Sequence, residues 1–124
     1  MKQCLTKNEA LQLEALGVSF DNATYYYNAA RKEFYPRSEE YQLREGDYIT
    51  FSVTDMLLIM PDYILEEEFR EKAPQFRVYG TNCCGYYDVG NISTDSWYQY
   101  FNKKELADNL YDCLVWLKMQ NLIK

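Results

Sequence analysis

The stretch ELADNLYDCLVWLK, residues 105–118, carries the strongest sign of regular structure in this sequence. Its apolar side chains recur at three- and four-residue spacing, which places them along one stripe of an α-helix. Asn102 is a good N-cap residue, Glu105 lies at the third helical position after it, and Asn121 can close the helix. The sequence therefore predicts an amphipathic C-terminal helix that acts as the lid of the core, and its stripe consists of Leu106, Ala107, Leu110, Leu114 and Leu117.

Two further helices are predicted from paired capping residues, in which a hydroxyl and a carboxylate each accept a backbone N–H. The first helix runs to about Leu16, and Gly17 stands where a left-handed residue is needed after a helix end. The second covers Val53–Met60, because Pro61 stops it. The pairs are Thr6 with Glu9, and Ser52 with Asp55.

Strands are predicted where the apolar period changes to two. Residues 75–79, 86–89 and 97–101 read as a three-stranded antiparallel meander that leads directly into the C-terminal helix. Residues 64–72 fit a helix or a strand. Shorter strands are predicted in the N-terminal half, at 24–27, 34–35, 41–43 and 48–51.

Together these elements predict one α+β domain over residues 1–124. We expect an antiparallel meander of three to five strands, with helices packed mainly on one face. The C-terminal amphipathic helix is the main lid of that face.

The composition narrows the classes of function. The chain has no histidine beside 13 tyrosines and two tryptophans, so the commonest general base and metal ligand are missing. Its 19 acidic and 13 basic side chains give a net charge of −6, which disfavours a nucleic-acid partner. The sequence shows no secretory signal and no apolar run that could span a bilayer, which predicts a cytoplasmic protein without a membrane partner.

No motif indicates catalysis, a cofactor or a metal. Neighbouring Cys83 and Cys84 point apart, and the glutamate run 66–68 diverges on any helix or strand, so neither predicts a metal site. None of the five glycines opens a helix as a phosphate loop would, and a Ser–His triad has no base. We therefore predict no enzyme and no catalytic residue, with all cysteines as reduced thiols.

Tyrosines and tryptophans provide the main candidate for a binding surface, because they are enriched where proteins meet. They fall on both faces of the predicted strands, and helices cover only one face of a sheet. We expect Trp97 and Phe101 to point inward, although a β-bulge there would exchange the two faces. Residues 28–48 could instead cover the second face. The candidate binding residues are Tyr25, Tyr27, Tyr86, Tyr98 and Tyr100.

The order of these pieces resembles a group of small uncharacterised proteins encoded by phages, prophages and mobile elements of gut anaerobic bacteria of the Bacteroides type. The resemblance covers most of the chain and rests on caps, a proline stop and a helix stripe. Residues 118–121 replace the Asn-Gly close of that group, and residues 66–74 resemble an insertion. The stretches that carry the resemblance are LEALGV, DNAT, FSVTDMLLIMPDYI and ELADNLYDCLVWLKMQNLIK.

This resemblance implies an accessory protein of a phage or mobile element that acts by binding a protein of the host or of the phage. Host takeover or action against a host defence is the implied setting. The alternative is a small-ligand-binding domain with an aromatic cleft between sheet and loop.

Overall fold

The computed structural model describes residues 1–64, 74–87 and 97–123, and within them it confirms the α+β class. Three helices and six strands follow one another along this part of the chain. Their bounds are α1 Lys7–Ala15, β1 Tyr25–Asn28, β2 Glu33–Pro36, β3 Tyr48–Thr50, α2 Val53–Ile59, β4 Gln75–Tyr79, β5 Cys83–Tyr87, β6 Trp97–Phe101 and α3 Leu106–Met119, with a 3₁₀ turn at Phe20–Asn22.

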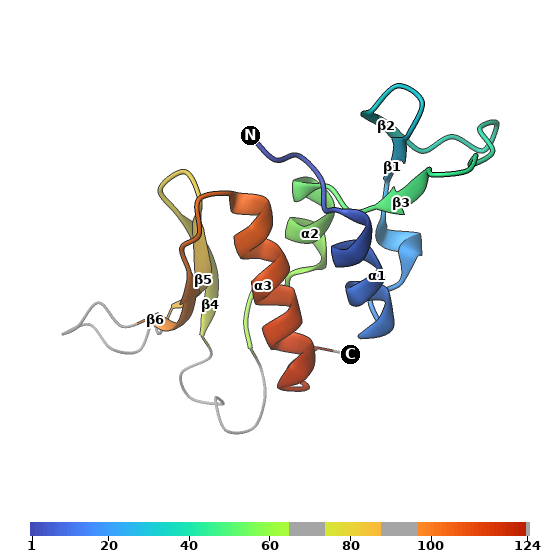
Figure 1. The fold of residues 1–124 in the computed structure, drawn as a ribbon. Coiled ribbons are helices and arrows are strands. Elements are labelled where there is room, and N and C mark those ends of the chain that lie inside the picture. The colour runs from blue at the N-terminus through green and yellow to red at the C-terminus, as the bar shows by residue number, and fades with distance from the viewer. Residues whose placement is uncertain (65–73, 88–96, 124) are drawn as a thin grey trace.

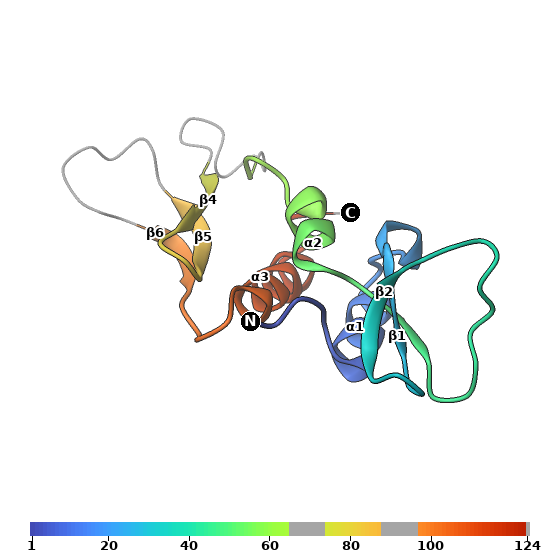
Figure 2. The ribbon, with the colours of Figure 1, turned by 90° about the horizontal axis from the view of Figure 1, so that it is seen from above.

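The strands form two separate antiparallel sheets rather than one. β4, β5 and β6 make the expected meander, whereas the N-terminal strands form a second sheet in the order β2-β1-β3. Figures 1 and 2 show the layers in the order meander, α3, the pair α1 and α2, and then the N-terminal sheet. The N-terminal strands therefore cover α1 instead of extending the meander, and α3 contacts both α1 and α2.

Both N-terminal capping boxes are present. Glu9 N–H donates to the Thr6 hydroxyl, and Thr6 N–H donates to the Glu9 carboxylate. Ser52 and Asp55 exchange the same two bonds, and Asp55 also accepts from the backbone N–H and the hydroxyl of Thr24. This buried carboxylate thereby fixes the start of α2 against the residue that precedes β1.

The start of α3 differs from the prediction. The N-cap is Glu105 and not Asn102, and its side chain makes no capping bond. Other side chains bind the backbone before the helix instead, because Asn82 donates to the carbonyls of Lys103 and Lys104. The predicted end of the helix is correct, since Asn121 adopts a positive φ of 57° and Leu122 N–H donates to Leu117 O.

Some strand limits differ as well. β5 begins at Cys83, three residues before the predicted strand 86–89, because it pairs along the whole length of β4. Residues 41–43 form no strand and lie in the loop between β2 and β3. The predicted continuation of β5 at residues 88–89 and the undecided segment from residue 65 to 72 lie outside the described residues.

The core is centred on α3. Ala107, Leu110, Leu114 and Leu117 are fully buried, as the predicted stripe requires. On the meander side, Trp116 contacts the ring of Tyr86, and Cys113 hydrogen-bonds Cys84. The N-terminal segment closes the other side, because Leu5 N–H donates to Phe51 O and Thr50 Oγ1 donates to Leu5 O.

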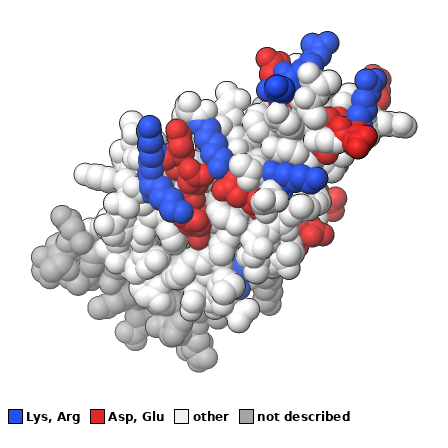
Figure 3. Space-filling model, viewed as in Figure 1, with Lys and Arg blue, Asp and Glu red and all other residues white. Residues whose placement is uncertain are grey.

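Charged side chains hold the N-terminus to the helices. Lys2 Nζ lies 2.7 Å from a Glu9 oxygen and 2.6 Å from an Asp108 oxygen, and so connects α1 with α3. A second ion pair joins Lys103, which precedes α3, to Asp112 within α3 at 2.7 Å. Figure 3 shows basic side chains next to acidic ones across this face of the molecule, with no broad patch of one sign.

Replacing Leu114 by alanine should lower the free energy of unfolding by about 2–5 kcal/mol, because the change leaves a cavity beneath a fully buried helix face. Urea denaturation followed by circular dichroism measures this loss. Met119→Ala, in the exposed last turn of α3, is the matched control and should change stability by no more than about 0.5 kcal/mol. Equal stability of Leu114→Ala and wild type would remove α3 from the core.

The ion pair between Lys2 and Glu9 should make the stability of the fold depend on pH. Burial alone would raise the pKa of Glu9, but hydrogen bonds from Lys2 and from the Thr6 backbone outweigh burial and lower it. A lowered folded-state pKa gives stability that is present above the unfolded value and is lost as pH falls through the folded value. The Lys2→Gln variant should therefore have a lower melting temperature than wild type at neutral pH. On acidification its melting temperature should fall by less than that of wild type. Lys7→Gln, on the exposed side of α1, should follow the wild-type curve in thermal melts across that range.

Candidate functional site

Four aromatic rings gather on the face of the meander that points away from α3. This outer face consists of the side chains that alternate with the buried Cys84 and Tyr86. Trp97 lies at its centre, with ring centroids of its neighbours 5.5 to 6.5 Å away. We call the four rings the aromatic cluster: Tyr79, Tyr87, Trp97 and Tyr100.

A β-bulge decides which rings belong to this cluster. The register of β5 and β6 shifts between Tyr86 and Tyr87, so that Tyr87 pairs with Trp97 whereas Tyr86 pairs with Gln99. The prediction that Trp97 points inward is therefore wrong, because the extra residue moves it to the outer face. Phe101 lies beyond the bulge and points inward as predicted, against Trp116.

Gly85 lies under the centre of the outer face. It pairs with Arg77 on one side and with Tyr100 on the other. A Cβ at this position would lie 2.2 Å from Gln99 O and 2.6 Å from Tyr100 Cα, which no side chain can tolerate. Only glycine allows β5 and β6 to approach this closely, and the residue is buried although it carries no side chain.

Arg77 is the one charged residue that the described strands place on the outer face. Its guanidinium carbon lies 4.7 Å from the centre of the Tyr87 ring, a cation–π arrangement. Two of its nitrogens donate to Gln75 Oε1 at 3.2 and 3.1 Å. Arg77, Val78, Tyr79, Tyr87 and Trp97 line an open hollow of 440 Å³.

The other predicted tyrosines lie elsewhere. Tyr86 is fully buried beneath α3 and donates its hydroxyl to Pro61 O at 2.7 Å, so it lies on no surface. Tyr86 lies two residues after the buried Cys84 on the central strand β5, so its side chain points to the same buried face. Tyr98 is 45% exposed, but its ring lies on the α3 side, 5.9 Å from Trp116. Of the meander tyrosines proposed from sequence, Tyr100 alone joins the cluster, and it is 51% exposed.

Most aromatic rings of the N-terminal sheet pack against one another. Tyr27 packs against Phe34 and Tyr48 with centroids 5.1 Å away in both pairs. On the opposite face Tyr41 stacks on Tyr26 at 4.4 Å and donates its hydroxyl to Asp47. Tyr41, in the loop that follows β2, thus lies over one face of this sheet, so residues 28–48 contribute to the N-terminal sheet and not to the second face of the meander.

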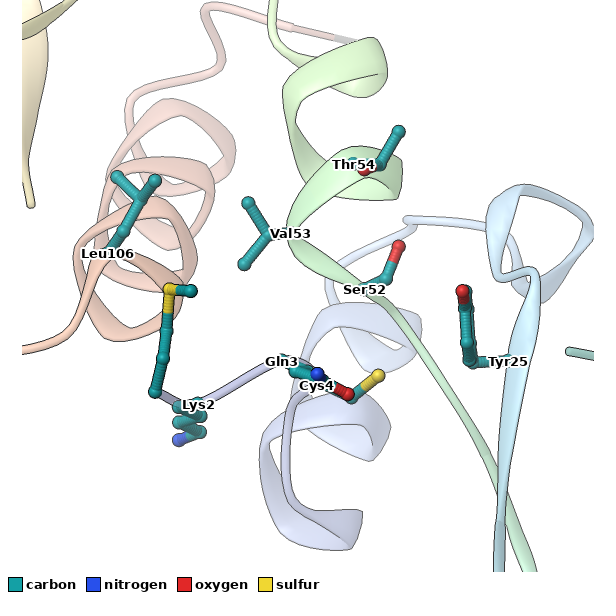
Figure 4. A pocket seen from close by; sticks show the side chains of 9 residues that line it. Lys2, Gln3, Cys4, Tyr25, Ser52, Val53, Thr54 and Leu106 are labelled. Carbon is teal, nitrogen blue, oxygen red and sulfur yellow. The ribbon is translucent and has the colours of Figure 1, made fainter. Parts of the chain in front are cut away.

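Tyr25 borders a separate pocket of 280 Å³ between the N-terminal segment and α2 (Figure 4). In this view Tyr25 and Leu106 lie at opposite ends, with Cys4 and Ser52 between them. Burial raises the pKa of Cys4 to about 11, so the thiol stays protonated at neutral pH. Typical ligand pockets measure about 300–1,000 Å³, so this pocket is small for a metabolite site.

The aromatic cluster could not be assembled from sequence alone. Tyr79 and Tyr87 belong to segments predicted as strands, but their partner Trp97 was assigned to the opposite face. The signal that could have found the cluster is Gly85, because a glycine within a strand often marks a bulge or a close backbone approach.

The part of the chain that the structure describes shows neither a metal-binding cluster nor a membrane-spanning helix. No group of three or more acidic, cysteine or histidine side chains converges there as metal ligands would. No described helix combines the length and apolar character that crossing a membrane requires. Comparison of the chain with protein-family models, with curated proteins and with solved structures finds no match.

The four cysteines are free thiols in different surroundings, and they should react at different rates. Cys4, Cys84 and Cys113 are buried, and the hydrogen bond that the Cys113 thiol donates to Cys84, together with burial, raises the pKa of Cys113. Cys83 is half-buried on the outer side of β5. A chromogenic disulfide reagent at neutral pH should therefore label Cys83 first and the buried three only on unfolding. Cys83→Ser should remove the fast phase, and a fast phase that persists would contradict this assignment.

Proposed function

We propose that this protein acts by binding another protein through the outer face of its meander. The observation that carries the proposal is Trp97 at the centre of a ring of exposed and half-exposed tyrosines beside Arg77. Tryptophan, tyrosine and arginine are the residues enriched in binding hot spots, which cluster near the centre of an interface. Tyr79 is 71% exposed and Tyr100 is 51% exposed, so a partner can reach both rings.

The proposed role is non-enzymatic. Rings and one guanidinium supply rigid contact area and hydrogen-bond donors, which are the groups that a binding surface uses. In the same proposal, the chain is an accessory protein of a phage or mobile element that works in the cytoplasm of a bacterial host. The resemblance of its sequence to phage and prophage proteins supports this setting, and a host protein or a component of a host defence is then the target.

The binding role can be tested with Tyr100→Ala. At a hot spot this change should weaken binding by about 2 kcal/mol, roughly thirtyfold in the dissociation constant. Stability should change by no more than about 0.5 kcal/mol, because the ring lies on the surface. The measurement is affinity capture from a bacterial lysate, followed by calorimetry of the purified captured protein against each variant.

Tyr98→Ser is the matched control, because Tyr98 is similarly exposed on the same strand but lies toward α3. It should leave the affinity for the captured protein unchanged. Capture that is equally strong with wild type and Tyr100→Ala would show that the outer face is not the binding surface. Thermal stabilisation by a metabolite, unchanged in Tyr100→Ala, would instead favour a small-ligand site such as the pocket at Tyr25.

A further inference from the structure

Arginine and tryptophan on the outer face can only donate hydrogen bonds, whereas its tyrosine hydroxyls both donate and accept. Arg77 and Trp97 carry N–H groups and have no acceptor atom. The Gln75 oxygen, an acceptor on the same face, is already occupied by two bonds from Arg77. The described strands place no carboxylate on this face, although the chain as a whole has 19 acidic residues. A ligand that offers acceptors and apolar rings complements the N–H groups of Arg77 and Trp97 and the rings of the aromatic cluster.

We propose that the segment docked on the outer face is a proline-rich stretch of the partner in the polyproline II conformation, with an acidic side chain beside the prolines. This inference rests on the proposed binding role of the same face. Proline has no N–H, and a polyproline II helix leaves its carbonyls unpaired, so the segment offers acceptors and few donors. Aromatic-lined grooves on other domains recognise such segments because their backbone is already ordered before binding.

The ring geometry fits an extended apolar ligand. The planes of Tyr87 and Trp97 are inclined by 88°, and those of Tyr79 and Trp97 by 76°. Rings at nearly right angles form walls and a floor, against which a pyrrolidine ring can pack on more than one side. The hollow is lined by residues of β4, β5 and β6, so a chain that crosses the strands can contact several of these rings.

The positive charge of Arg77 favours an acidic residue beside the prolines of the ligand. Arg77 makes no ion pair with any described carboxylate, and its charge is held in place over Tyr87. An acidic side chain on the ligand would be its natural counter-charge. Arg77 is the single cation that the described strands place on this face, and the chain has a net charge of −6. Both observations argue against single-stranded nucleic acid, which needs a positive groove along its backbone.

The test is selection from a random peptide display library on the immobilised full-length chain. We expect the selected peptides to be enriched in proline and to carry an acidic residue. Synthetic versions are then titrated by tryptophan fluorescence on Trp116→Phe, in which Trp97 is the remaining tryptophan, with Trp97→Phe as the converse reporter. Replacing the prolines by alanine should weaken binding by about tenfold or more.

Two variants separate the parts of this inference. Tyr79→Ala removes a well-exposed ring and should weaken every selected peptide without loss of folding, whereas Arg77→Gln should weaken the acidic peptides and leave their glutamine counterparts unchanged. Selected peptides without proline, binding unaffected by Tyr79→Ala, or a selection that yields no binder would each overturn the proline-rich ligand. If a protein captured from lysate still depends on Tyr100 in that case, the proposed binding role stands while this inference falls.

Discussion

Helix α3 has to pack against two layers at once, and the rest of the structure depends on this constraint. It contacts β5 and β6 on one side and α1 and α2 on the other. A polar residue within such a helix needs internal partners, since an unsatisfied buried group costs about 1–3 kcal/mol. Asn109 is fully buried, accepts from Lys103 N–H, and donates to the carbonyls of Lys103 and Asn82. It thereby fixes the β4–β5 turn and the approach to α3 relative to each other.

Features set by neighbouring residues were predictable from the sequence. The capping boxes at Thr6 and Ser52 and the left-handed residues Gly17 and Asn121 all depend on contacts within a few positions of the chain. The start of α3 was not predictable in this way, because Asn82, a residue far away in sequence, binds the backbone before the helix. The division of the strands into two sheets likewise depends on which layer each strand covers, and alternation of apolar residues carries no such information.

The candidate site shows the same limit at a single position. Alternation along β6 places Trp97 and Phe101 on one face, and the one-residue bulge moves Trp97, but not Phe101, to the other. The consequence is large because a tryptophan changes from a core residue into the centre of a surface cluster. Gly85 makes this arrangement possible, since β5 and β6 approach too closely there for any side chain. The bulge and the glycine therefore belong to one structural feature, which joins the strand geometry to the proposed function.

The many tyrosines of this chain serve different purposes, and their partners separate them. The Tyr86 hydroxyl is paired inside the core, the Tyr41 hydroxyl is paired with Asp47, and the rings of Tyr27 and Tyr48 stack on each other. In these places aromatic area stabilises a small protein with thin layers. On the outer face the rings contact one another, but no described helix or strand covers them, as Figures 1 and 2 show. Rings held rigidly by their neighbours lose little conformational entropy when a ligand binds, which is the property that a recognition surface requires.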